Sequence, residues 1–389
     1  MTIIYCTQIY FLDAAIEYVR LIASQGYKVH VAIELSPNQL KTNILDIETD
    51  LNKFAPLTSF EEVVDTWGLH YLKPFFTECI SVNFVIYPSK KILQTRKVAR
   101  ELGKYINEIR PDYIHLDDFS SRTLFQLSFL IKYRKILIAN IHDPLTHSGE
   151  FNLSREIYRK LWFNLIPSFV VFSEFSKTVL RPQINRNKKI TVLKLMPYTV
   201  YKSFASISSE SILKPKKYIS FVGRISPYKG VDLFIEAIDV VSKRYPEIQF
   251  FIGGKTIANY DPEFLNRKCD NIIIENKFLS NSEISDIIND SQLIVCPYKD
   301  ATQSGVIMTA QALNCPVLVT PVGGLPEYIE SGKSGLVSKD VSVNSLSEGL
   351  LDFIQGNQYK NMCQYLKGNV VHNMIIDYNL KGIHEIYSS

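Results

Sequence analysis

The stretch FVGRISPYKG at residues 221–230 overlaps an apolar segment, 218–222, that predicts a short buried strand. Ser226 is a favoured helix-capping residue, and Pro227 suits the first turn of a helix. Apolar residues then recur at helical spacing over 231–241. The stretch therefore predicts a strand, a turn and a helix, the building unit of an α/β domain.

Two cations flank this turn. Arg224 follows Gly223 at the end of the strand, and Lys229 is expected in the first turn of the helix. A guanidinium offers a planar fork to phosphate oxygens, an ammonium adds a mobile point charge, and the unpaired amides of a helix start favour anions. The pattern indicates a diphosphate site. On this stretch alone, a solvated Arg and Lys beside an ordinary turn is an equal alternative.

A second segment, residues 296–327, has the sequence CPYKDATQSGVIMTAQALNCPVLVTPVGGLPE. Its pattern is strand, small-residue loop, helix, strand and glycine loop. Together with GRISPYKG, this order resembles the C-terminal domain of the retaining glycosyltransferases of family 4, which have the GT-B fold. The resemblance implies an α/β protein with two Rossmann-like, doubly wound parallel-sheet domains that face each other across a cleft.

The resemblance also implies roles for single residues. Arg224 and Lys229 match the family's positions that hold the donor diphosphate and act in catalysis. The loop and helix start of the second segment match the place where the donor sugar and phosphate meet backbone amides. The implied donor-binding residues are Gly223, Gly254, Gln303, Ser304, Gly305, Val306 and Gln311.

The chain departs from the family at two of these positions. The family usually carries two glutamates eight positions apart, where this chain has Gln303 and Gln311. A Gln keeps the reach and hydrogen bonding of Glu but loses the charge. The form ATQSGV resembles one branch of the family, so we expect a working variant in which Gln303 meets the sugar and Gln311 the ribose. A non-catalytic relative is the alternative.

Four further residues are candidates for the site. His142 follows a predicted strand at its carboxyl end, where ligands bind in open α/β sheets, and the matching family His approaches the donor sugar. A hydrogen-bonded loop His is the alternative. Ser173 and Lys177 match a family segment near the site, but Ser173 is equally a good helix cap. Glu327 matches the family's G-G-x-P-E, where an architectural role is the alternative.

Composition narrows the class of protein. With 389 residues, 46% hydrophobic and 21% charged, the chain suits two globular domains. It shows no apolar run long enough for a membrane span and no secretory signal, so we expect a cytoplasmic protein. The six cysteines form no C-x-x-C pair and are expected to be reduced. No metal motif and no dinucleotide fingerprint is present, so we expect neither metal nor cofactor.

The pattern along the chain predicts four parts. Strands alternate with helices over an N-terminal acceptor domain, 1–197, although segment 35–80 shows no clear period. A polar linker is expected at 198–216, and a donor domain at 217–368. By resemblance, residues 369–389 form a helix that returns to the first domain. A predicted strand near 113–116 ends in Asp117 and Asp118, which we expect to be structural or acceptor contacts.

One predicted helix, near 91–108, is strongly basic. Its apolar residues Ile92, Ala99, Leu102, Ile106 and Ile109 are expected to face the core. The cations at and just before it are Lys90, Lys91, Arg96, Lys97, Arg100 and Lys104. A solvated helix face and a peripheral contact with an anionic membrane are the two interpretations.

The resulting hypothesis is a retaining hexosyltransferase. It would move a sugar from a nucleotide-diphosphate sugar to a glycan or lipid-linked acceptor in cell-surface polysaccharide biosynthesis, with no nucleic-acid partner. The family's same-face mechanism fits, because no carboxylate nucleophile stands at the matched positions. The alternatives are another GT-B enzyme, such as a sugar-nucleotide epimerase or a phosphorylase, and a non-catalytic nucleotide-sugar binding subunit.

Overall fold

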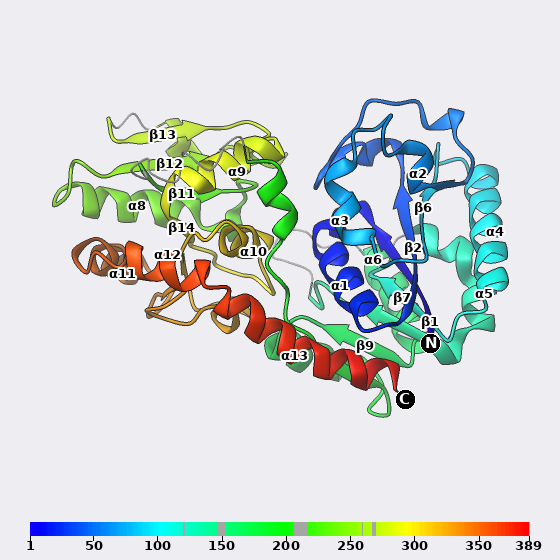
Figure 1. The fold of residues 1–389 in the computed structure, drawn as a ribbon. Coiled ribbons are helices and arrows are strands. Elements are labelled where there is room, and N and C mark those ends of the chain that lie inside the picture. Colours follow the sequence, from blue (N-terminus) through cyan, green and yellow to red (C-terminus); the bar gives the residue numbers. More distant parts are fainter. Residues whose placement is uncertain (120, 146–152, 206–216, 259, 267–269, 389) are drawn as a thin grey trace. The chain divides into compact units, whose positions relative to one another are not determined.

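The computed structural model describes residues 1–388 except 120, 146–152, 206–216, 259 and 267–269. The chain divides into two compact units (Figure 1). The first contains residues 1–144, 151–196 and 376–389, and the second contains 145–150 and 197–375. Of the predicted linker 198–216, residues 206–216 lie outside the described part.

The first unit is built on an eight-stranded sheet with the order β10-β9-β8-β7-β1-β2-β6-β5. All neighbouring strands are parallel except β5 and β6, which are antiparallel. Chain order reverses between β1 and β7, as in a doubly wound sheet. The strands are β1 Thr2–Gln8, β2 Lys28–Leu35, β5 Leu57–Ser59, β6 Ser81–Ile86, β7 Tyr113–Asp117, β8 Leu137–Asn140, β9 Ser168–Val171 and β10 Lys189–Val192.

Apolar residues at helical or strand spacing fill the core of this unit. Ile4 on β1, Ile114 on β7 and Ala139 on β8 belong to one buried cluster, and α4 contributes Leu102 and Ile106 to it. Segment 35–80, which shows no clear period, contains the two short paired strands β3 Lys41–Thr42 and β4 Leu45–Asp46. The helices of this unit are α1 Leu12–Ser24, α2 Phe60–Val63, α3 Lys73–Phe76, α4 Ile92–Ile109, α5 Leu127–Lys132, α6 Leu153–Leu165 and α7 Glu174–Leu180.

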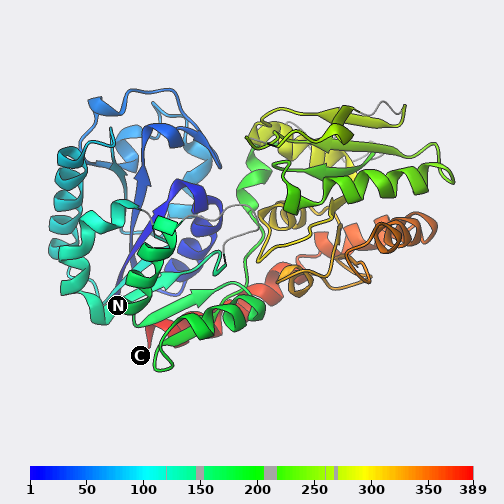
Figure 2. The same ribbon diagram turned by 180° about the vertical axis from the view of Figure 1, so that it is seen from behind.

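The end of the last helix, α13 (Val370–Tyr387), belongs to the first unit from Ile376 onward. Asn379 is fully buried, donates to the carbonyl of Lys194 at 2.8 Å and accepts from its backbone N–H at 2.7 Å. An added Cβ on Gly382 would lie 2.5 Å from Leu193 Cδ2, so a larger residue there would require that side chain to move. The two ends of the chain consequently lie in one unit (Figures 1 and 2).

The second unit is built on a six-stranded parallel sheet with the order β13-β12-β11-β14-β15-β16. Its chain order reverses between β11 and β14. The strands are β11 Tyr218–Val222, β12 Gln249–Gly253, β13 Ile272–Glu275, β14 Ser291–Cys296, β15 Val317–Val319 and β16 Gly335–Val337. The helices besides α13 are α8 Val231–Ser242, α9 Asn281–Asp290, α10 Gly305–Ala312, α11 Val343–Gln355 and α12 Tyr359–Lys367.

Two local predictions are wrong. Ser226 does not cap α8 and Lys229 is not in that helix, because Pro227–Lys229 form a 3-10 turn and α8 begins only after Gly230. The left-handed Gly230 (φ 64°) breaks the chain direction between the two. Ile92 does not face the core: it lies at the start of α4 with 58% of its side chain exposed, and Leu93 beside it is 79% exposed.

Two observations concern the described residues as a whole. None of their helices has both the length and the apolar character needed to cross a membrane. None of the five described cysteines forms a disulfide, and Cys269 lies outside the described part.

Candidate functional site

The turn after β11 and the turn after β14 meet in the second unit. Both follow the carboxyl ends of strands at the point where the chain order reverses, which is where open α/β sheets bind ligands. The Lys299 backbone N–H donates to the Tyr228 carbonyl at 2.7 Å. At Gly230 an added Cβ would lie 1.9 Å from the Pro297 carbonyl oxygen, so only glycine permits this approach.

Lys229 extends from the first turn to the second. Its ammonium lies over the Tyr298 ring, 3.7 Å from the centroid, in cation–π geometry. The Tyr298 hydroxyl is 3.2 Å from Ser304 Oγ, at the start of α10. Burial raises the pKa of the neighbouring Cys296 thiol to about 11 despite the lysine's charge. The structure thus brings the predicted residues Lys229 and Ser304 against one aromatic ring.

Tyr298 is a residue that the sequence analysis did not single out. It is 1% exposed and is held where the ammonium, the hydroxyl of Ser304 and the strand end meet. The signal available in the sequence was an aromatic residue two positions after a buried strand, near the start of the second segment. That signal is weak, because buried aromatics after strands are common.

Three further predicted residues lie together at the same sheet edge. Gly223 has φ 132° and Gly254 has φ 148°, values that side chains rarely adopt. A Cβ on Gly254 would lie 1.8 Å from the Gly223 carbonyl oxygen, and a Cβ on Gly223 would lie 3.6 Å from Val306 Cγ2. The missing side chain of Gly254 therefore permits a close approach of the backbone to Gly223.

Arg224 differs from Lys229 in its surroundings. It is exposed and has no hydrogen-bond or ion-pair partner within the described part of the chain. Two residues later, Ser226 is 3% exposed, and its hydroxyl has no partner among the described residues. The exposed Arg224 guanidinium is therefore available to bind an anionic ligand.

The start of α10 adds backbone donors. Ser304 is its N-cap residue but makes no side-chain capping bond, so the first amides of this helix lack that acceptor. Gly305 is exposed, and a Cβ there would lie 3.1 Å from the Tyr198 ring. Helix starts with unpaired amides favour anions. Gln303, directly before the cap, is partly buried.

Gln311 lies farther along α10 and is 4% exposed. Its amide nitrogen donates to the Tyr328 carbonyl at 2.8 Å, while its Oε1 has no partner in the described part. Glu327 precedes Tyr328 in the 3-10 turn Leu325–Tyr328 and is partly buried. The side-chain amide of Gln311 thus holds the turn that carries Glu327, a contact that the sequence pattern does not predict.

The first unit holds a second cluster at its own reversal point. His142 Nε2 lies 2.7 Å from Asp117 Oδ1, and both side chains are at most 3% exposed. The carboxylate also accepts from Thr7 Oγ1 at 2.7 Å and from Asn140 Nδ2 at 2.9 Å. Phe11 stacks on the imidazole with ring centroids 3.9 Å apart and planes at 6°.

Electrostatics ties the pair together. Burial alone would lower the pKa of His142, but the Asp117 charge and hydrogen bond outweigh it, so that pKa is raised. Burial likewise opposes ionisation of Asp117, but His142 and the other donors hold its pKa below the usual value. Nearby, burial raises the pKa of Asp13 to about 6. Asp117, expected as a structural or acceptor contact, is the ion-pair partner of the predicted His.

Ser173 and Lys177 have local partners. Ser173 is fully buried and caps α7, where its Oγ accepts from the Ser176 N–H at 3.0 Å. Lys177 Nζ lies 3.3 Å from Glu174 Oε2 one turn earlier. The described residues contain no group of three or more His, Cys, Asp or Glu side chains placed to hold a metal ion.

Comparison with known proteins adds independent findings. Residues 204–369 match the family model for glycosyl transferases group 1. A D-inositol 3-phosphate glycosyltransferase of Corynebacterium glutamicum is 26% identical over 150 residues, 36% of this chain and 36% of that protein. An uncharacterized glycosyltransferase of Haemophilus influenzae is 20% identical over 284 residues, 72% of this chain and 77% of its own length.

The first of these matches spans little more than a third of the length of either protein. Among solved structures, Anabaena HepE in complex with UDP and glucose is similar over 100% of both chains, with a TM-score of 0.66 and 13% identity. At that identity the likeness shows the fold alone. The fold is GT-B, and residues 204–369 form a domain similar to glycosyl transferases group 1.

Proposed function

We propose that the protein is a retaining glycosyltransferase of family 4 that transfers a sugar from a nucleotide-diphosphate sugar. The observation that carries the proposal is the pair of cations at the sheet reversal of the second unit. Arg224 has no protein partner in the described part, and Lys229 is fixed over Tyr298. A departing diphosphate is the anion that such a pair, next to a helix start, would stabilise.

The chemistry divides among few groups. Arg224 and Lys229 neutralise the leaving diphosphate, and the amides at Ser304 and Gly305 donate to it. The family resemblance assigns His142 to the sugar, and Asp117 holds the imidazole in its orientation and protonation state. Retention follows a same-face course, in which the C–O bond to the leaving phosphate breaks while the acceptor oxygen bonds to the same carbon and passes its proton to a phosphate oxygen.

A transfer assay tests the proposal. Purified protein is first screened by thermal shift against UDP-, GDP-, ADP- and dTDP-sugars, because a donor at about 100 times its dissociation constant adds about 2.7 kcal/mol of stability. The stabilising donor is then incubated with glycan and lipid-linked acceptors, and NMR establishes the configuration of the product. An α-linked product from an α-linked donor supports retention. Binding without transfer to any acceptor would favour the binding-subunit alternative, and inversion would exclude the same-face course.

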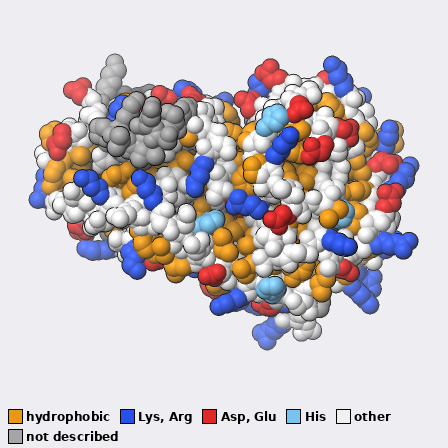
Figure 3. Space-filling view, viewed as in Figure 1, with side chains coloured by type: hydrophobic (Ala, Val, Ile, Leu, Met, Phe, Trp, Pro, Cys, Tyr) orange, Lys and Arg blue, Asp and Glu red, His pale blue; other side chains and the backbone are white. Residues whose placement is uncertain are grey.

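The acceptor side rests on a separate feature, the basic face of α4. We propose that this face contacts an anionic membrane that carries a lipid-linked acceptor of cell-surface polysaccharide synthesis. Lys90, Lys91, Arg96, Lys97 and Arg100 are all exposed and, within the described part, free of ion pairs. Lys104 pairs with Glu101 at 3.0 Å. Figure 3 shows Lys and Arg side chains, with Asp and Glu between them, at the edge of the first unit where Figure 1 places α4.

The exposed Ile92 and Leu93 strengthen this proposal, because apolar side chains at the end of a basic helix suit the lipid interface. Changing Lys90, Lys97 and Lys104 together to Gln should weaken binding to phosphatidylglycerol vesicles on the order of 100-fold, since each cation contributes about 1 kcal/mol. The matched control changes the exposed Lys243, Lys360 and Lys367. Equal binding by both triple variants would leave the face as a solvated helix surface.

A further inference from the structure

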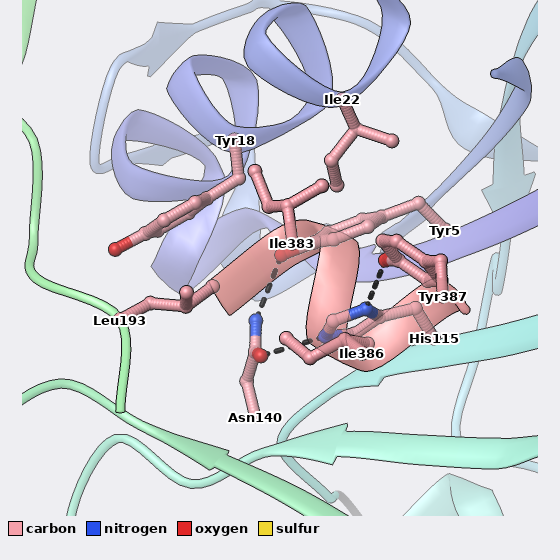
Figure 4. A pocket seen from close by; sticks show the side chains of 9 residues that line it. All are labelled: Tyr5, Tyr18, Ile22, His115, Asn140, Leu193, Ile383, Ile386 and Tyr387. Carbon is pink, nitrogen blue, oxygen red and sulfur yellow. Dashed lines mark hydrogen bonds between the residues drawn. The ribbon is translucent and has the colours of Figure 1, made fainter. Parts of the chain in front are cut away.

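A chain of buried hydrogen bonds runs from the last turn of α13 to the His142–Asp117 pair. Tyr387, near the end of the chain, is fully buried, and its hydroxyl lies 2.6 Å from His115 Nδ1 (Figure 4). His115 Nε2 lies 2.7 Å from Asn140 Oδ1. Asn140 Nδ2 reaches both the Tyr5 hydroxyl at 2.8 Å and Asp117 Oδ1 at 2.9 Å.

The direction of each hydrogen bond follows from Asp117. A carboxylate only accepts, so the Asn140 atom that faces it is the amide nitrogen, and Asn140 Oδ1 is left to accept. His115 Nε2 is therefore the protonated nitrogen. Burial lowers the pKa of His115 to about 4, so the ring is neutral and its Nδ1 accepts from the Tyr387 hydroxyl. From Tyr387 through His115 to Asn140 each side chain donates to the next, and Asn140 donates to Asp117 as well as to the Tyr5 hydroxyl.

We propose that Tyr387, His115 and Asn140 are positioning residues that set the basicity of Asp117 and, through it, the protonation of His142. Each donated bond polarises the next, which strengthens the Asn140 donor to the carboxylate. A carboxylate that receives stronger donors attracts the His142 proton less. The helix that supplies Tyr387 begins in the second unit with Val370–Ile375 and ends in the first.

Other charges also face His142, and the proposal must be separated from them. Asp118 and Asp143 raise its pKa through space, and Asp13 on α1 lies within range of the imidazole charge. The Asp118 backbone N–H donates to the Asn140 carbonyl at 3.1 Å, a bond that involves neither the Asp118 carboxylate nor the Asn140 side-chain amide. Variants at Tyr387 or His115 therefore leave those charges in place and change only the hydrogen bonds that lead to Asp117.

The test measures the His142 pKa directly, by NMR of histidine-labelled protein, with the signal assigned from a His142→Gln variant. Tyr387→Phe removes one hydroxyl and keeps the ring. Loss of that donor should raise the His142 pKa by about 0.3 to 0.5 pH unit. The shift is smaller than that from losing a direct hydrogen bond to Asp117, because Tyr387 acts through His115 and Asn140. His115→Phe breaks the same chain from β7 and keeps a ring against Tyr5, so it should shift the pKa in the same direction. It also serves if the first variant does not fold.

Two controls frame the result. Tyr27→Phe alters a ring 5.4 Å from that of Tyr387 but outside the chain, and should leave the His142 pKa unchanged. Thr7→Val removes a direct donor to Asp117 and should raise the pKa by about 0.5 to 1 pH unit. A folded Tyr387→Phe or His115→Phe protein with the wild-type His142 pKa, while Thr7→Val shifts it, would overturn the proposal.

The significance of the coupling rests on the proposed function, because that proposal gives His142 its role. The NMR readout needs no turnover, so the two can fail separately. A protein that transfers no sugar can still show the pKa shifts, and a working transferase can lack them. In an active protein, the pH profile of kcat should move in the same direction as the His142 pKa.

Discussion

The two sheets reverse their chain order in the same way, yet the polar groups at the two reversal points are in opposite states. In the first unit His142, Asp117, Asn140 and Thr7 satisfy one another and are almost fully buried. In the second unit Arg224 is exposed and unpartnered within the described residues. The first cluster is a preorganised protein network, whereas the second has binding capacity to offer a ligand.

The largest effect should come from breaking the first cluster. Asp117→Asn removes a buried carboxylate that takes three donors and leaves His142 without its counter-charge. We expect a loss of about 3–5 kcal/mol in the free energy of unfolding near pH 5.5, measured by urea denaturation. A loss below about 1 kcal/mol would mean that the cluster is not an ion pair.

The same pair predicts a pH dependence. Because the folded pKa of His142 is raised, its stabilisation is complete below the unfolded value of about 6.5 and is lost as pH rises through the folded value. The lowered pKa of Asp117 contributes above about pH 4 and is lost as pH falls through its folded value. Wild type should therefore lose stability relative to Asp117→Asn as pH rises above about 6.5. Parallel curves would contradict the assignment.

The second cluster should matter for turnover rather than for stability. Arg224→Ala and Lys229→Ala should each reduce kcat by about 100-fold or more, because each removes a cation from the charge that develops on the leaving group. Unfolding of the Arg224 variant should match wild type, since that side chain has no protein partner in the described part. Lys243→Ala, an exposed lysine at the end of α8, is the matched control. Near-normal kinetics in both site variants would remove the assignment.

Smaller effects should separate the two glutamines. Gln303→Ala should impair catalysis, while Gln311→Ala should weaken nucleotide binding. Each variant loses side-chain hydrogen bonds, and each bond contributes about 0.5–1.5 kcal/mol. Because Gln311 also donates to the Tyr328 carbonyl, Gln311→Ala should loosen the turn that carries Glu327 and lower the melting temperature. If the wild type binds no nucleotide sugar while the double Gln303→Glu, Gln311→Glu variant does, the native chain is a lapsed transferase.

The smallest expected effect is that of EDTA. Two cations and a helix start suffice to carry the diphosphate charge, so transfer should persist in excess chelator. Activity that is lost in EDTA and restored specifically by magnesium or manganese would instead mean that a metal carries the diphosphate.

The comparison of the two units also shows what the sequence could predict. The strand and helix pattern around 218–241 and 296–327 predicts the fold of the second unit, because buried parallel strands appear in a sequence as short apolar runs. The 3-10 turn at Lys229 was missed because Pro227 suits the first turn of either helix type, and only the contact of Gly230 with Pro297 decides between them. The His142–Asp117 pair was missed because it joins two strands 25 positions apart, which no local pattern reports.

The most direct test of the account is diphosphate binding at the second cluster. Isothermal titration should be run with the nucleoside diphosphate that stabilises the wild type most among UDP, GDP, ADP and dTDP, against wild type, Arg224→Ala and Lys243→Ala. The account predicts binding by wild type and Lys243→Ala, and affinity at least about tenfold weaker in Arg224→Ala, since a charge-assisted hydrogen bond contributes about 1.5–3 kcal/mol. Equal affinity in all three proteins, or binding of no nucleoside diphosphate by wild type, would contradict it.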